Sequence, residues 1–328
     1  MAAEIIEKIN VTGNEKTSRD SILRISELNE GDEFTNKMLE NSKKAVASSG
    51  VFEDVKISTS RGSDPMRRVI TITVKEKTTW FTVPSFSYSQ TGFSAGGVVG
   101  ETNLFGRLKK MAVFGDWGPD VKRIAIGYRD PDVFGTKMTL ALDGISRVDD
   151  MAEYKDRIET RKVRVTESGF TFLPGVRWTE HVTTSLGIYY RKIRQRLRFS
   201  DPNRDDRDPV EDRGNDIAVV AEFDFKKMNT YSGIEDGTDV KFSTQFSDDR
   251  YFSDYDYTKQ LVNFRQAFAF LHDKANFTTR ASIQLGKTLP YYIELMAGGD
   301  NLRGYLNRQF RGDTKYAFGQ EMLLPIYE

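Results

Sequence analysis

The chain has 328 residues, and its 48 lysine and arginine side chains balance 48 aspartate and glutamate side chains, so the formal net charge is zero. Such a chain lacks the concentrated positive charge that nucleic acids attract, and we expect no nucleic-acid partner. Cysteine is absent and only two histidines occur, which excludes disulfides and a multi-histidine zinc site. We expect neither a bound metal nor a cofactor.

The first ten residues mix Glu4, Glu7 and Lys8 with isoleucines, which is not the pattern of a signal peptide. Either the protein is not exported, or a targeting segment has been removed ahead of Met1. The longest uncharged stretch, residues 78–100, is rich in serine, threonine and glycine. It is too polar for a spanning helix, which needs about 20 mostly apolar residues. If this chain crosses a membrane, it must do so with strands.

Residues 4–76 have the pattern of a small α+β unit. Isoleucines alternate at its start, helix-spaced apolar residues follow, and two further alternating segments close it. Capping hydroxyls and turn glycines mark the boundaries between these segments. The predicted elements are a strand ended by Gly13, a helix capped by Thr17 or Ser18, a helix at 35–48 stopped by Gly50, and strands at 51–60 and 68–75.

Three segments of this unit resemble a POTRA (polypeptide-transport-associated) domain. IEKINVTGNEKT at 6–17 resembles its opening strand and turn, GVFEDVKIS at 50–58 its glycine and following strand, and VITITVKEK at 69–77 its closing strand. Because the three motifs occur in the family's order, we assign residues 1–77 to a POTRA domain.

From Trp80 onward the helical spacing disappears and strand-like segments recur. In residues 275–285 one face carries Phe277, Ile283 and Leu285, whereas Arg280 points to the other face. This alternation suits a barrel with a lipid-facing exterior and a polar lumen, but a soluble sandwich shows it too. Segments of about 9–11 residues favour tilted membrane strands over the shorter strands of soluble sheets.

Twelve strands are predicted in this part of the chain, with charged loops at 147–161 and 199–214. Their approximate ranges are 80–90, 92–101, 108–116, 122–129, 136–146, 162–173, 179–196, 215–225, 238–246, 258–271, 275–285 and 316–327.

Four segments after the POTRA-like unit resemble the outer-membrane protein assembly factors of the BamA and TamA type. They are GETNLFGR at 100–107, YRDPDVFGTKM at 128–138, GGDNLRGY at 298–305 and YAFGQEMLLPIY at 316–327. The resemblance implies an all-β antiparallel transmembrane barrel over residues 78–328. That family has sixteen strands, so we expect twelve of them here, with the four C-terminal strands missing after Glu328 or the barrel closed differently.

The resemblance also implies a loop that folds into the barrel through Arg303, Gly304 and Tyr305. By its position in the next strand, Glu321 is the expected partner of Arg303. A buried guanidinium needs such a partner, since an unpaired charge is costly away from water. An ordinary exposed turn with a surface arginine is the alternative.

No nucleophile elbow, phosphate-binding loop or dinucleotide fingerprint occurs, so we expect no catalytic residue and no enzyme. The resemblance instead implies a factor that inserts client barrels into a Gram-negative-type outer membrane, with its POTRA domain in the periplasm. Its expected partners are unfolded outer-membrane proteins, accessory periplasmic or lipoprotein subunits and the lipid bilayer. Clients would pair with the first barrel strand, at Thr82, Val83, Ser85, Phe86, Ser87 and Tyr88. The alternatives are a two-partner-secretion pore, or the translocator half of a larger surface protein.

Overall fold

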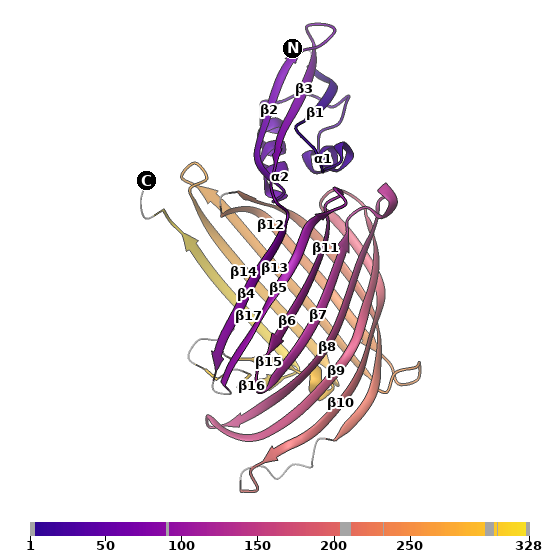
Figure 1. Ribbon diagram of the computed structural model, residues 1–328, viewed down its shortest axis with the longest axis vertical. Helices are drawn as coiled ribbons and strands as arrows, with labels where there is room; N and C mark the ends of the chain where they lie inside the picture. Colours follow the sequence, from indigo (N-terminus) through magenta and orange to yellow (C-terminus); the bar gives the residue numbers. More distant parts are fainter. Residues whose placement is uncertain are drawn as a thin grey trace.

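The computed structural model describes residues 4–89, 92–203, 211–231, 233–298, 305–306 and 308–325. A small α/β domain stands above one rim of a large curved antiparallel sheet (Figure 1). The small domain comprises β1 (Ile5–Thr12), α1 (Arg19–Ser26), α2 (Asn36–Ser48), β2 (Phe52–Arg61) and β3 (Arg67–Glu76). This confirms the predicted order of strand, helix, helix, strand, strand.

Local capping explains why the two helices begin and end where they do. The side chain of Ser18 accepts a hydrogen bond from the backbone amide of Ser21, and Thr35 accepts one from Met38. Each hydroxyl satisfies an amide that the first helical turn leaves without a partner. The chain leaves α2 through Gly50, whose φ of +76° is costly for other residues.

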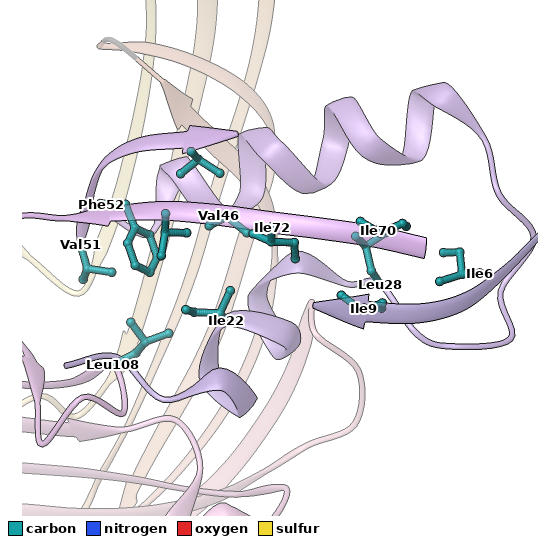
Figure 2. Packing of buried hydrophobic residues seen from close by; sticks show 12 residues of the cluster. Ile6, Ile9, Ile22, Leu28, Val46, Val51, Phe52, Ile70, Ile72 and Leu108 are labelled. Carbon is teal, nitrogen blue, oxygen red and sulfur yellow. The ribbon is translucent and has the colours of Figure 1, made fainter. Parts of the chain in front are cut away.

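The small domain folds its helices over a three-stranded sheet in the order β1-β3-β2, with β1 parallel and β2 antiparallel to β3. Its core holds buried residues from every element, among them Ile9, Ile22, Val46 and Ile72 (Figure 2). Leu108, from a turn of the large sheet, is 8% exposed and packs on the same cluster. The two units therefore share apolar contacts.

The large sheet has twelve strands, each hydrogen-bonded to its neighbours in the sequence. They are β4 (Trp80–Ser89), β5 (Gly92–Leu104), β6 (Lys109–Trp117), β7 (Val121–Asp130), β8 (Met138–Lys155), β9 (Ile158–Arg177), β10 (Val182–Ser200), β11 (Asp212–Tyr231), β12 (Ile234–Ser247), β13 (Tyr257–Phe270), β14 (Ala275–Lys287) and β17 (Thr314–Leu323). The predicted count and order of barrel strands are confirmed. The rim beside the small domain is called the near rim, and the opposite one the far rim.

The charged segment at 147–161 is not the loop that the sequence predicts. β8 and β9 run for 18 and 20 residues and meet in a tight turn at Asp156 and Arg157, which have φ of +52° and +66°. Its charges are tolerated in strands because they pair across them, as Arg164 does with Asp150 at 2.6 Å. The other predicted loop shortens to 201–211, of which 204–210 lie outside the described residues.

Side chains alternate between the two faces of the large sheet. On β14 and β17, Ile283 and Tyr316 lie opposite each other on the outer face, whereas Lys315 faces inward and donates to the carbonyl of Met296. Among the described residues, neither α-helix has the length and apolarity to cross a bilayer. An apolar outer face with a polar inner face is the pattern of a membrane barrel.

Candidate functional site

All six residues predicted to meet a client lie on β4, which forms one edge of the sheet. β4 pairs with β5 along its whole length, and its other side has no strand partner among the described residues. Thr82, Phe86 and Tyr88 share the outer face with the 55% exposed Val99, while Val83, Ser85 and Ser87 face inward. Phe86 and Tyr88 are 68% and 85% exposed.

The pairing of β4 with β5 is weak by composition. Pro84 lies opposite Gly97 in a part of β5 that also contains Gly96 and Gly100. Glycine lowers strand stability because it has no side chain to pack and loses more backbone entropy. At the other end of the sheet β17 pairs with β14 alone among the described strands. Among the described strands the large sheet thus presents two edges, β4 and β17.

The segment between β14 and β17 folds back into the barrel, and its described residues include η2 (Tyr291–Ile293), β15 (Leu295–Ala297) and β16 (Phe310–Gly312). We call residues 288–313 the inward loop. Tyr292 is 2% exposed and packs against Met151, Val163 and Ile193 on the inner wall of β8, β9 and β10. The inward loop therefore rests on the far half of the longest strands.

Two arginines join the inward loop to the wall. The guanidinium of Arg308 binds both carboxylate oxygens of Asp149 on β8, at 3.0 and 2.8 Å. Arg311 lies 2.8 Å from Glu294 and 3.4 Å from Glu153, and its guanidinium stacks 3.7 Å from the ring centre of Tyr291. A planar guanidinium suits bidentate pairing and stacking, so these contacts fix orientation as well as position.

A third anchor is the buried carboxylate of Asp216 on β11, which is 0% exposed. It accepts hydrogen bonds from the hydroxyls of Tyr292, in the inward loop, and of Tyr257, at 2.8 Å. Ser247 donates to its second oxygen at 3.1 Å. Hydrogen bonds to both oxygens offset the cost of burying this charge.

The predicted motif of the inward loop lies partly beyond what the structure describes. Arg303 and Gly304 lie outside the described residues, so the contact between Arg303 and Glu321 stays a prediction. Tyr305 is 43% exposed and its ring packs edge-on against Phe310 at 5.1 Å. Glu321 faces the lumen from β17 and pairs with Arg280 on β14 at 3.0 Å.

Sequence reasoning missed the anchors that the structure does show. Arg308 and Arg311 follow the motif within eight residues, in LNRQFRGD, and were available as a signal. Their partners Asp149 and Glu153 lie in a segment that the sequence predicts to be a charged loop. Only the extension of β8 and β9 turns these two carboxylates toward the lumen.

The small domain contacts five turns of the near rim. Lys16, Arg24 and Glu27 pair with Glu101, Asp132 and His181 at 3.1, 3.8 and 3.3 Å. From α2, Lys44 pairs with Asp273 at 2.7 Å, and the hydroxyl of Ser48 accepts from the amide of Thr230 at 3.1 Å. The domain therefore lies across the mouth of the barrel (Figure 1).

Behind this mouth the lumen contains a cavity of about 610 Å³. Charged and polar side chains from β6 to β12 line much of it, including Lys110, Asp130, Glu222 and Gln245. The near half of the lumen thus contains a polar cavity, whereas the inward loop packs against the wall in the far half.

Comparison with known families settles the class of this protein. The POTRA family, described as a surface antigen variable number repeat, matches residues 4–77. The Omp85 superfamily domain matches residues 103–325, which is most of the barrel. The chain belongs to the Omp85 superfamily. It is thus a member of a family of outer-membrane β-barrel proteins, as its fold and its resemblance to assembly factors predict.

Solved structures agree with the Omp85 fold. BamA from Haemophilus ducreyi lacking POTRA domains 1–3 is 18% identical, with 93% of this chain and 60% of that chain covered and a TM-score of 0.56. CdiB from Escherichia coli is 12% identical, with 99% and 62% covered and a TM-score of 0.63. CdiB from Acinetobacter baumannii is 13% identical, with 98% and 60% covered and a TM-score of 0.57.

This Omp85 chain spans about three fifths of the length of those structures. No curated protein gives a significant match to its sequence. At these identities the likeness shows the fold and does not separate assembly from transport.

Proposed function

We propose that this Omp85 chain inserts client β-barrel proteins into the outer membrane, receiving them through its POTRA domain and pairing them with β4. The observation that carries the proposal is the side of β4 that no described strand covers, in a sheet whose outer face is apolar. Unpaired backbone amides and carbonyls are costly in lipid, so such an edge gains free energy from an added strand. Strand addition is a common way for a sheet to bind an extended chain.

The proposal assigns β4 the role of a temporary template. The glycines of β5 weaken the β4–β5 pair, so a client strand can compete for β4 at modest cost. The POTRA domain, which in this proposal lies in the periplasm, would pass clients or accessory subunits to this edge. Neither role needs a catalytic residue or a cofactor, and we propose that the protein is not an enzyme.

Cysteine crosslinking in membranes tests this function. Single cysteines at Thr82, Ser85 and Ser87 are combined with a cysteine in the last strand of a client whose assembly is stalled. We expect crosslinks along β4 in register, and none from the matched controls Leu186 and Ile188 on β10, which are 63% and 48% exposed but lie mid-sheet. Crosslinks that are absent from β4, or equally frequent on β10, would contradict insertion through this edge.

A secretion pore is the second candidate, and the polar cavity of about 610 Å³ in the lumen favours it. In that case a dedicated passenger would pass through the barrel once the inward loop moves aside. Steady ion conductance through the purified protein, raised when Arg308 and Arg311 are replaced, would support the pore. A crosslink between a passenger and Lys110 or Glu222, rather than β4, would decide for it.

A further inference from the structure

The outer face of β10 changes abruptly from apolar to basic on its way to the far rim. Its outward residues on the near side are Leu186, Ile188 and Tyr190. The next four outward positions are all cationic and exposed, namely Lys192, Arg194, Arg196 and Arg198. The inward positions between them differ: Ile193 is 1% exposed and Gln195 is 2% exposed. The four cations therefore lie on one face of β10 and are not merely part of a run of charged residues exposed on all sides.

Neighbouring strands place more positive charge beside these residues. Arg194 lies directly opposite Arg213 on β11, and Arg196 lies directly opposite Arg164 on β9. Like charges at directly paired positions destabilise a sheet unless something neutralises them. Sequence alone does not reveal these pairs, because they arise from the register of three strands.

Protein carboxylates neutralise only part of this charge. Arg164 is bound by Asp150 through two contacts of 2.6 and 2.7 Å. In the described part of the chain, no carboxylate reaches ion-pair distance of Arg194, Arg196 or Arg213. Glu211, which precedes Arg213 by two residues just ahead of β11, is exposed and forms no ion pair with Arg213. Two opposed arginines with no counter-ion among the described residues indicate a place for an external anion.

The position of the cations relative to the apolar belt indicates which kind of anion. Phe170 and Tyr190 form an aromatic pair with ring centres 5.6 Å apart. The pair lies where the apolar outward residues of β10 end and the cationic ones begin, on the side of the far rim. Strands rise about 3.3 Å per residue and tilt by about 40°, so Lys192 and Arg194 lie roughly 5–10 Å beyond Tyr190 along the membrane normal. That depth is the headgroup layer, since aromatic residues mark the border of the hydrocarbon core.

We propose that Lys192, Arg194, Arg196 and Arg213, together the basic face, bind phosphate groups of anionic lipids in the leaflet at the far rim. A guanidinium fork pairs with two phosphate oxygens, and one phosphate between opposed arginines removes their repulsion. The exposed Phe172 and Leu186, which lie nearer the middle of the membrane than the basic face, would contact the acyl chains of the same lipid. An occupant with both a phosphate and an acyl chain fits this surface, whereas a soluble partner leaves the apolar half uncovered. The basic face does not depend on whether the protein inserts or exports its clients.

Native mass spectrometry of the full chain tests lipid binding directly. The protein is released from detergent after incubation with phosphatidylcholine, with phosphatidylglycerol, or with a diphosphorylated lipid A glycolipid. We expect retention of the phosphoglycerol and diphosphorylated lipids over phosphatidylcholine. The triple variant R194Q/R196Q/R213Q should weaken that retention by about tenfold or more, since each basic residue near an anionic surface adds to the attraction.

Two matched variants show whether the basic face itself is responsible. K56Q/R67Q/K75Q removes three exposed charges from the POTRA domain and should leave lipid retention unchanged. R194K/R196K/R213K keeps the charge but loses the fork, and should fall between wild type and the glutamine variant. Heat-modifiable migration confirms that each barrel is folded.

Three results would overturn the proposal. The first is equal retention of the anionic lipids, phosphatidylglycerol and diphosphorylated lipid A, by wild type and the glutamine variant. The second is equal loss in the POTRA control, which would indicate a general effect of net charge. The third is full displacement of the bound lipid by inorganic phosphate at matched concentration, which would make this a site for a free anion.

Discussion

At the scale of single residues, the position of the inward loop depends on ion pairs with buried carboxylates of the barrel wall, chiefly that of Arg308 with Asp149. The side chain of Asp149 is only 7% exposed, and Arg308 supplies its two closest contacts to the inward loop. Removing one partner of such a pair costs more than the pair itself contributes, because the remaining charge is left without solvent. Arg308 therefore holds both the loop and the wall residue that it meets.

We predict that Arg308→Ala frees the inward loop from β8, at a cost of roughly 2 kcal/mol given that Arg308 is partly exposed. A cysteine placed at Phe310 should then react faster with a water-soluble maleimide than in the wild-type background. Arg250→Ala is the control, because Arg250 pairs with Asp248 in a different far-rim loop and is 76% exposed. Equal reaction rates in wild type and Arg308→Ala would show that the arginine does not hold the loop.

Glu76 is a second residue whose charge positions its surroundings. Burial opposes its ionisation, but the amides of Thr17 and Lys16 donate to it at 2.6 and 2.9 Å and hold the pKa of this carboxyl below its ordinary value of 4.5. These contacts fix the turn that places Thr17 beside Asn103 of the barrel. Glu76 thus connects the last POTRA strand to the near rim.

The lowered pKa of Glu76 gives this turn a pH dependence with a definite sign. Ionised Glu76 stabilises the turn fully above pH 4.5, and this stabilisation is lost as pH falls through its lower folded pKa. Hydrogen exchange of the 13–18 segment, corrected for intrinsic rates, should accelerate below that point in wild type. In Glu76→Gln it should be fast and independent of pH. A wild-type profile as flat as that of Glu76→Gln would refute the assignment.

At the scale of elements, β4 and β17 each have one paired side among the described strands of the large sheet, whereas the ten strands between them have two. In an antiparallel pair, alternate amides of a strand point toward its neighbour, so half of those in β4 point to the open side. β10 is paired on both sides over most of its length. The difference concerns only backbone hydrogen bonds and does not depend on side-chain chemistry.

We predict that alternate amides of β4 exchange with solvent far faster than any amide in the centre of β10. Fragmentation-resolved hydrogen exchange in lipid nanodiscs measures this, with residues 184–190 of β10 as the internal control. The period of two distinguishes an open edge from a strand that is frayed throughout. Slow exchange at every position of β4 would mean that another strand covers the edge.

At the scale of the whole molecule, the POTRA domain is held to the near rim largely by ion pairs, some partly exposed and one, between Arg24 and Asp132, largely buried. The pair of Lys44 with Asp273 and that of Arg24 with Asp132 lie at opposite sides of the mouth. Exposed ion pairs contribute little each, and salt weakens them. Leu108 adds an apolar contact that salt does not weaken.

We predict that D132N/D273N broadens the distance distribution between spin labels on POTRA residue Lys56 and rim residue Lys274. Electron–electron double resonance in nanodiscs measures the distribution. High salt should broaden the wild-type distribution in the same direction, since both changes weaken the same pairs. Glu53→Gln, which breaks an exposed pair with Lys75 inside the POTRA domain, is the control and should change nothing. An unchanged distance distribution in D132N/D273N would show that these two ion pairs are not needed to hold the POTRA domain on the near rim.

The sequence by itself determined the local order of this protein. Alternation, capping residues and turn glycines predict the five POTRA elements and twelve barrel strands, because these depend on neighbours within a few residues. The six residues proposed to meet a client could be assigned to the first barrel strand for the same reason. Their position at an open edge follows only from the order of the strands in the folded sheet.

The tertiary structure decided which charges meet. Asp149 and Arg308 are 159 positions apart and look like two solvated residues in the sequence, yet they form a bidentate pair. The opposed Arg194 and Arg213 likewise depend on the register of β10 with β11. Local pattern carries no information on such pairs, because strand length, register and the folding of a loop into the lumen bring them together. Those three features bring Arg308 to Asp149 on the inner face of the wall and place the residues of the basic face together on its outer face.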